Sequence, residues 1–113
     1  MKKDPKIFLQ HILESIERIE EFTKNISKED FLKSTETQDA VIRRLEIIGE
    51  ATKNLPKGFI QKCPEIPWGE LARLRDKLIH GYFGVDLNLT FEIVNKDLPK
   101  LKKQISKIVK ENL

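Results

Sequence analysis

Apolar residues recur every three or four positions along most of the chain, which is the spacing of amphipathic helices. Near the N-terminus they fall at Phe8, Ile12, Ile16, Ile19, Phe22 and Ile26. Asp4 is a suitable cap for this first helix, and Pro5 suits its first turn because a missing N–H costs nothing there. A cap and short turn are expected at residues 27–30, with Phe31 and Leu32 as apolar anchors.

A second long helix is predicted from about Thr37 to Leu55. Its main apolar stripe consists of Val41, Leu45, Ile48, Thr52 and Leu55, and a second stripe consists of Ala40, Ile47 and Ala51. Two stripes predict a helix that is buried on two sides. Gly49 lies between them and costs about 1 kcal/mol relative to Ala. We therefore expect Gly49 to allow the close approach of another helix, from the same chain or from a second copy.

Prolines and Gly58 interrupt the middle of the chain, so residues 57–66 are predicted to be a connection with at most one helical turn. Pro67 suits the first turn of a third helix. The core face of that helix is expected to be Trp68, Leu71, Leu74 and Leu78. Gly81 and Gly84 should end it.

The last helix is capped by Asp86 or Asn88 in this interpretation. Its apolar positions alternate by four and three residues: Leu87, Phe91, Val94, Leu98, Leu101, Ile105 and Ile108. The stripe continues without interruption through Pro99, which predicts one long helix bent at that proline rather than two helices. The elements together predict an all-α, up-and-down bundle of four main helices with a short extra helical turn.

Composition agrees with one helical domain over residues 1–113, because a chain of 113 residues has room for one core. Hydrophobic residues make up 39%, too many for a disordered chain. The formal net charge of +3 does not by itself indicate a nucleic-acid partner. Cys63 is the only cysteine, which excludes a disulfide scaffold and a thiolate zinc site and favours a buried thiol. No apolar run approaches the roughly 20 residues of a membrane span, so a cytoplasmic protein is expected.

Reactive side chains are concentrated in residues 73–86, which contain two of the five arginines, one of the two histidines and the only tyrosine. Asp76 and His80 are four residues apart, so a continuous helix would place them on one ridge, where the carboxylate could orient the imidazole. Arg75 is five residues before His80, about 140° around an ideal helix. Joint action of Arg75 and His80 therefore needs a distorted helix end or a partner subunit. Arg73 is nearly in line with His80 and is a candidate extra phosphate contact.

An arginine and a histidine suffice for one kind of RNA chemistry. The histidine can take or give a proton near neutral pH, and the arginine can stabilise a phosphate whose charge grows in the transition state. RNA supplies its own nucleophile in the 2′-hydroxyl, so the pair permits metal-free cleavage to a 2′,3′-cyclic phosphate. No metal-ligand spacing occurs in the sequence, and no metal or cofactor is predicted. A structural interpretation stays open, because a histidine before a glycine often only caps a helix.

Residues 75–82, RDKLIHGY, resemble the R-x4-H-x-Y motif of the HepT-like branch of the HEPN superfamily, small all-α toxins of prokaryotic toxin–antitoxin pairs (type VII systems). Residues 39–51, DAVIRRLEIIGEA, are similar to a second signature of that family, and residues 68–86 and 97–99 agree in order and spacing. The resemblance covers essentially the whole chain. It implies a HEPN-like helical domain and a metal-independent endoribonuclease.

The resemblance also implies roles and partners. Arg75 and His80 would be the catalytic residues, while the supporting roles of Asp76 and Arg73 rest on their spacing from His80. The protein would form a homodimer whose two protomers line one cleft, and RNA, tRNA among the candidates, would be its substrate. A cognate MNT-domain nucleotidyltransferase antitoxin would transfer AMP onto Tyr82 and so block the cleft. Two alternatives are a non-catalytic nucleotide-binding or adaptor subunit of a nucleotidyltransferase complex, and a plain helical dimerisation module.

Four further features have mainly structural interpretations. His11 is expected at the surface, and Trp68 is expected in the core rather than as a base-stacking platform. Glu46 and Glu50 are four residues apart and could form a carboxylate pair, although a structural role or a place at the edge of the dimer cleft is favoured. A stripe of lysines on the last helix is expected to be a solvated face, with RNA-backbone contact as the alternative. It consists of Lys96, Lys100, Lys103, Lys107 and Lys110.

Overall fold

The computed structural model describes residues 4–80 and 84–112. Its helices are α1 (Pro5–Thr23), α2 (Lys28–Lys33), α3 (Thr35–Lys53), α4 (Lys57–Lys62), α5 (Trp68–Ala72), α6 (Leu74–Leu78), α7 (Leu87–Glu92), the π-helical turn η1 (Ile93–Asp97) and α8 (Leu98–Asn112). Two short strands, β1 (Ile79–His80) and β2 (Gly84–Val85), lie between α6 and α7.

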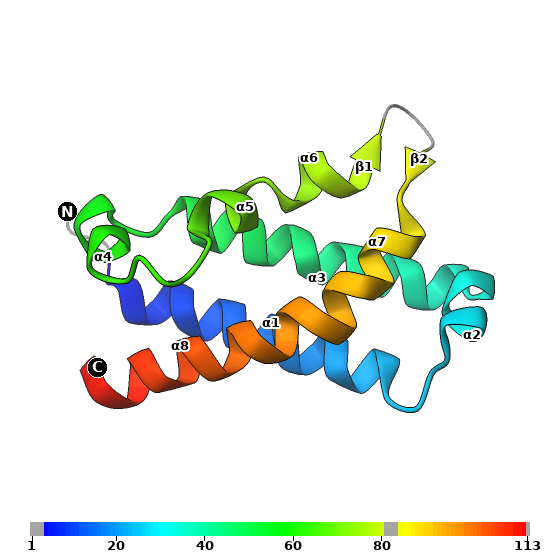
Figure 1. The fold of residues 1–113 in the computed structure, drawn as a ribbon, viewed down its shortest axis with the longest axis horizontal. Helices are drawn as coiled ribbons and strands as arrows, with labels where there is room; N and C mark the ends of the chain where they lie inside the picture. Colours follow the sequence, from blue (N-terminus) through cyan, green and yellow to red (C-terminus); the bar gives the residue numbers. More distant parts are fainter. Residues whose placement is uncertain (1–3, 81–83, 113) are drawn as a thin grey trace.

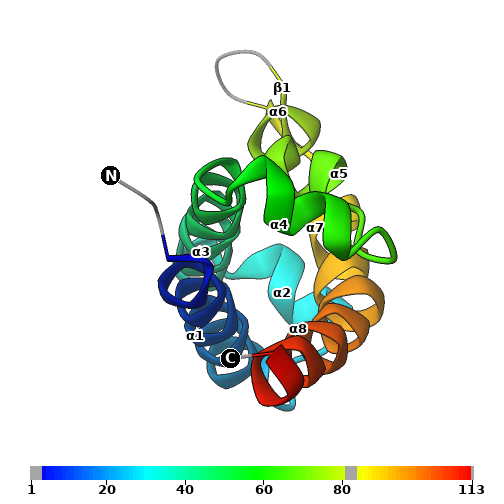
Figure 2. The same ribbon diagram turned by 90° about the vertical axis from the view of Figure 1, so that its left-hand side faces the viewer.

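The helices form the predicted up-and-down bundle. Figure 1 shows α1 and α3 running in opposite directions, α5 and α6 returning above α3, and the helical path from α7 to α8 running back beneath them. The end-on view in Figure 2 shows these helices arranged as a ring. The third position of the bundle is shared by α5 and α6, and α3 packs against both. None of the helices in the described part of the chain is long and apolar enough to cross a membrane.

Helix α1 begins as predicted. The side chain of Asp4 accepts a hydrogen bond from the backbone N–H of Lys6 at 2.9 Å, and Pro5 is the first helical residue. The core side of the helix is formed by Leu9, Ile12, Ser15, Ile16 and Ile19. The prediction was wrong for Phe22, which lies past the buried stripe and is 39% exposed.

Helices α2 and α3 are both capped by serine. Ser27 accepts from the N–H of Asp30, and Ser34 accepts from the N–H of Thr37. Helix α3 therefore starts at Thr35, two residues before the predicted start. Its predicted main stripe, Val41 to Leu55, is buried throughout. The second stripe is only partly buried, because Ala40 and Ile47 stay at intermediate exposure.

Two predictions for the middle of the chain need correction. Residues 57–66 contain more than one helical turn, since α4 has six residues. The third helix is not continuous, because the backbone turns at Arg73 and separates α5 from α6. No glycine or proline marks this break, so the apolar pattern alone does not reveal it. The predicted core face, Trp68, Leu71, Leu74 and Leu78, is nevertheless buried.

The last helix is capped by Asp86, whose side chain accepts from the N–H of Leu89 at 2.9 Å. Helices α7, η1 and α8 follow one another without a break, and their common path changes direction along its length (Figure 1). The predicted bend takes the form of the π-helical turn η1, directly before Pro99. Pro99 has no N–H to donate to the preceding turn, and π turns are a recognised cause of such bends. The wider turn brings both Ile93 and Val94 into the core.

Candidate functional site

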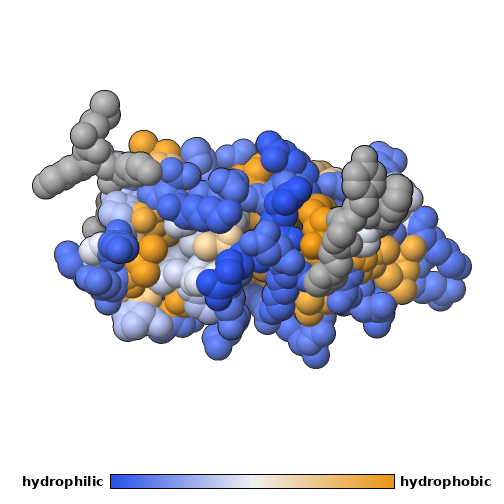
Figure 3. Space-filling model, turned by 90° about the horizontal axis from the view of Figure 1, so that it is seen from above, coloured by the Kyte–Doolittle hydropathy of each residue, from blue (hydrophilic) through white to orange (hydrophobic). Residues whose placement is uncertain are grey.

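The segment with the predicted catalytic residues runs from α6 into the two-stranded ladder. Leu74 and Leu78 are buried and attach α6 to the core. The three charged residues between them are exposed: Arg75, Asp76 and Lys77. This side of the molecule is mainly hydrophilic in its middle part, with apolar side chains gathered to either side (Figure 3). A short helix that is fixed by two leucines thus presents charged groups to solvent.

The helix ends earlier than predicted, which corrects the proposed alignment of Asp76 with His80. Ile79 has extended backbone angles of φ −102° and ψ 115°, and it pairs with Val85 while His80 pairs with Gly84. The N–H of Asp86 also donates to the carbonyl of Leu78 at 2.8 Å. His80 therefore lies in a strand, and no helical ridge joins it to Asp76. The predicted 140° separation from Arg75 no longer applies for the same reason.

The described residues leave part of the predicted site out. The backbone of His80 belongs to β1, but its side chain lies outside the described residues. Tyr82, the predicted AMP acceptor, lies outside the described residues altogether. The backbone of residues 79 and 80 follows α6 directly in the chain, and its pairing with residues 84 and 85 holds it beside the end of that helix.

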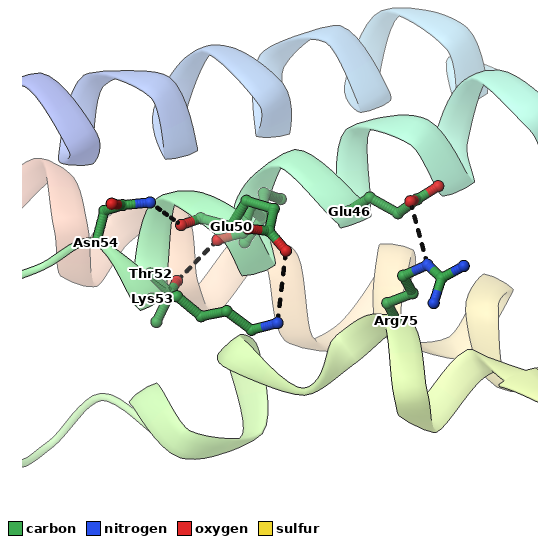
Figure 4. Close-up of polar contacts among 7 residues, drawn as sticks. Glu46, Glu50, Thr52, Lys53, Asn54 and Arg75 are labelled. Carbon is green, nitrogen blue, oxygen red and sulfur yellow. Dashed lines mark hydrogen bonds and ion pairs between the residues drawn. The ribbon is translucent and has the colours of Figure 1, made fainter.

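Arg75 reaches across to helix α3. Its Nε lies 3.4 Å from Oε2 of Glu46, as Figure 4 shows. The side chain of Arg75 is 62% exposed and that of Glu46 is 30% exposed. The ion pair is therefore partly shielded on the α3 side and open on the arginine side. Glu50 instead pairs with Lys53 at 3.4 Å, so the suggested Glu46–Glu50 carboxylate pair is replaced by two separate pairs with cations.

The contact between Glu46 and Arg75 was not predicted from the sequence, although a signal for it was present. Gly49 contacts α5 through the backbone, because a Cβ added at Gly49 would lie 3.2 Å from the carbonyl oxygen of Leu71. This is the close helix approach expected for Gly49, and it occurs within the chain. Glu46 is three residues earlier on the same face of α3. It therefore faces the next segment of the chain, which is α6.

Arg73 and Arg75 point to different parts of the surface. A Cβ added at Gly69 would lie 3.5 Å from Nη1 of Arg73, so the guanidinium of Arg73 lies back over α5. Arg73 lines a shallow hollow with Glu70, Asp76 and Lys77. Both predicted supporting residues, Arg73 and Asp76, thus border one hollow, whereas Arg75 is directed toward α3.

Cys63 is a buried free thiol, as predicted. Burial, and secondarily the negative charge of Glu65, raise the pKa of this thiol above its ordinary value. The carbonyl of Cys63 accepts the indole N–H of Trp68 at 2.9 Å, and Trp68 is buried. A raised pKa disfavours the thiolate, which argues against a nucleophilic role for Cys63.

The remaining candidates, His11 and the lysine stripe, lie at the surface of the molecule. His11 is exposed and meets the ring of Phe8 edge-on, with ring centroids 6.3 Å apart. The lysine stripe from Lys96 to Lys110 is exposed along its whole length. Within residues 4–80 and 84–112, no three His, Cys, Asp or Glu side chains are grouped as metal ligands would be.

Comparison with known proteins identifies the class of this helical protein. The family model described as "Ribonuclease HepT-like" matches residues 12–108. A protein of Thermococcus cleftensis named "Probable ribonuclease HepT" is 56% identical over 110 residues, which are 97% of this chain and 100% of that protein. The chain belongs to the HepT-like ribonuclease family, within the HEPN superfamily.

Two further relatives contain a segment similar to this chain. A protein of Methanocaldococcus jannaschii named "Gamma-glutamylcyclotransferase and putative RNase" is 62% identical over 111 residues, or 98% of this chain, which spans only 50% of that protein. A "Putative RNase" of Caldanaerobacter subterraneus subsp. tengcongensis is 48% identical over 109 residues, covering 96% of this chain and 97% of that protein. No solved structure shows a significant match to the chain.

Proposed function

We propose that this protein is an endoribonuclease that cleaves RNA without a metal ion. In this reaction the 2′-hydroxyl attacks the adjacent phosphorus, the bond to the 5′-oxygen breaks, and the products are a 2′,3′-cyclic phosphate and a 5′-hydroxyl. Arg75 stabilises the charge that grows on the phosphate. His80 takes the proton from the 2′-hydroxyl or gives one to the leaving 5′-oxygen.

The observation that carries the proposal is the exposed guanidinium of Arg75, held at the bundle surface just before the strand that contains His80. Family membership supports the same assignment, since relatives across the full length of the chain have RNase in their names. The early end of α6 also supports it. A strand at residues 79–80 removes the helical constraint that would keep an arginine and a histidine five residues apart on different faces.

We further propose that the protein is the toxin of a toxin–antitoxin pair in the cytoplasm and works as a homodimer. An MNT-type nucleotidyltransferase would neutralise it by transferring AMP from ATP onto Tyr82. The modification would place a phosphate and a nucleoside two residues after His80, where they would compete with the RNA phosphate. Asp76 and Arg73 would assist from the hollow they share at the junction of α5 and α6.

An RNA cleavage assay in the presence of EDTA tests the proposal. The protein would first be checked by intact mass for the absence of AMP, and then compared with Arg75→Ala and His80→Ala. We expect cleavage by the unmodified protein to leave cyclic phosphate ends, and each substitution to lower the rate at least about 100-fold. Folded, unmodified protein that leaves total cellular RNA intact would contradict the proposal and favour a non-catalytic adaptor.

A further inference from the structure

The contact between Glu46 and Arg75 uses one particular edge of the guanidinium. Glu46 meets Arg75 at Nε, at 3.4 Å, and not at the terminal nitrogens. Figure 4 shows that both terminal nitrogens point away from Glu46. An arginine recognises phosphate by donating two N–H groups in a fixed fork. Because Nε faces Glu46, the two terminal nitrogens are the part of the guanidinium that remains available to bind a phosphate.

Helix α3 provides a firm base for this contact. Glu46 lies one turn before Gly49, where the backbone of α3 touches that of α5. The neighbouring residues Leu45 and Ile48 are buried. The side chain of Glu46 is less than half as exposed as that of Arg75. The carboxylate of Glu46 is thus the less mobile of the two groups, and the contact restricts the motion of the long side chain of Arg75.

We propose that Glu46 is a positioning residue, which holds the guanidinium of Arg75 so that its terminal nitrogens meet the RNA phosphate. The inference rests on the proposed ribonuclease function and adds to it a residue outside the R-x4-H-x-Y segment. Exposed ion pairs contribute little to folding stability, so the main effect of this pair is on where the guanidinium lies. Glu46 does not touch the substrate in this scheme and acts through Arg75.

The test compares Glu46→Gln with a matched control. Arg18 and Glu21 on α1 form another exposed Arg–Glu pair at the same distance, 3.4 Å, so Glu21→Gln makes the same chemical change elsewhere. We expect Glu46→Gln to lower kcat on the order of 10-fold because a misplaced catalytic group loses rate steeply. KM should not rise, since the substitution removes a negative charge near the RNA phosphate. Glu21→Gln should match the unsubstituted protein.

Two further measurements separate positioning from a general structural effect. Glu46→Asp keeps the negative acceptor one methylene further back, and its kcat should lie between those of the unsubstituted protein and Glu46→Gln. Thermal unfolding should show equal midpoints for Glu46→Gln and Glu21→Gln. An unchanged kcat in Glu46→Gln, or a fall in kcat together with a lower unfolding midpoint, would overturn the proposal.

A measurement independent of activity tests the contact itself. The chain has five arginines, so the side-chain Nε–H signals in a ¹⁵N spectrum are few and Arg75 can be assigned from Arg75→Lys. The Arg75 signal should shift in Glu46→Gln and stay in place in Glu21→Gln. If the unsubstituted protein cuts no RNA, the proposed function fails while this spectrum still reports on the pair. A signal that does not move in Glu46→Gln refutes the positioning role.

Discussion

Gly49 of α3 lies directly beneath the backbone carbonyl of Leu71 in α5, and a Cβ at position 49 would be 3.2 Å from that oxygen. A glycine in a helix is normally unfavourable, so its presence here reflects the close approach of the two backbones. The neighbour is a backbone atom and cannot rotate away as a side chain would. Because α5 leads directly into α6, this contact also helps to set the distance between Arg75 and α3.

Gly49→Ala is expected to lower the free energy of unfolding by about 1 kcal/mol, because crowding against the α5 backbone outweighs the gain in helix propensity. Gly58→Ala in α4 is the control. A Cβ at Gly58 meets nothing within 4 Å, so only the propensity gain applies and stability should rise by about 0.5–1 kcal/mol. Urea unfolding of both variants checks the sign of each change. Equal increases in stability would contradict the described contact.

Ser15→Ala is expected to stabilise the protein. Ser15 is fully buried in α1, and its Oγ has no hydrogen-bond partner among the described residues. Removing an unpaired buried hydroxyl should raise the free energy of unfolding by about 1 kcal/mol. Ser106→Ala on the exposed face of α8 makes the same change with no buried group and should give only a few tenths of a kcal/mol. Chemical denaturation of the two variants side by side provides the measurement.

The ion pair between Lys102 and Glu20 joins α8 to α1, with Nζ 2.7 Å from Oε1. The hydrogen bond to Glu20 raises the pKa of Lys102 above its ordinary value of 10.5. The folded state therefore holds this proton more tightly than the unfolded state, so the stabilisation is complete below pH 10.5 and is lost as the pH rises through the raised pKa. Both side chains are substantially exposed, so solvent screening keeps the contribution at about 0.5 kcal/mol.

Glu20→Gln should accordingly lower stability by about 0.5 kcal/mol at neutral pH and low salt. The difference from the unsubstituted protein should shrink at high salt, and again at a pH above 10.5. Unfolding curves of both proteins at neutral pH and above pH 10.5, each at low and at high salt, give the difference in stability under the four conditions. A difference that grows with pH would have the wrong sign for this pair.

Arg73 should affect RNA binding more than the chemical step. Its guanidinium lies over Gly69 and borders the hollow with Lys77, away from the pair formed by Arg75 and Glu46. Arg73→Ala is expected to raise KM about 3-fold and to reduce the salt dependence of RNA binding by about one phosphate contact, with kcat nearly unchanged. Steady-state cleavage at several salt concentrations measures both quantities. A large loss of kcat would place Arg73 at the reacting phosphate.

The sequence predicted the bundle well because burial follows helical periodicity. The main stripe of α3, the stripe of α8, the caps at Asp4, Ser27 and Asp86, and the close approach at Gly49 were confirmed. These features depend on side-chain pattern and local hydrogen bonding, which are properties of short segments.

The features that were not predicted depend on tertiary contacts. The break between α5 and α6 at Arg73 is not marked by a glycine or a proline. The early end of α6 follows from the pairing of residues 79 and 80 with residues 84 and 85. The Glu46–Arg75 pair joins residues 29 positions apart, a relation that periodicity within one helix does not describe. The roles of Arg75, His80, Asp76, Arg73 and Tyr82 remain predictions.

The π-helical turn η1 fixes the rotational phase between the two parts of the last helix. One extra residue in a helical turn rotates everything beyond it by about 100° relative to a plain α-helix. Leu101, Ile105 and Ile108 are buried with that rotation included. If residues 93–97 formed a plain α-helix with no residue removed, Leu101, Ile105 and Ile108 would turn away from the core, whereas deleting one of these five residues would let a regular helix keep them in place. The burial of the residues after η1 therefore depends on the wider turn, which absorbs one residue more than a regular helical turn would hold.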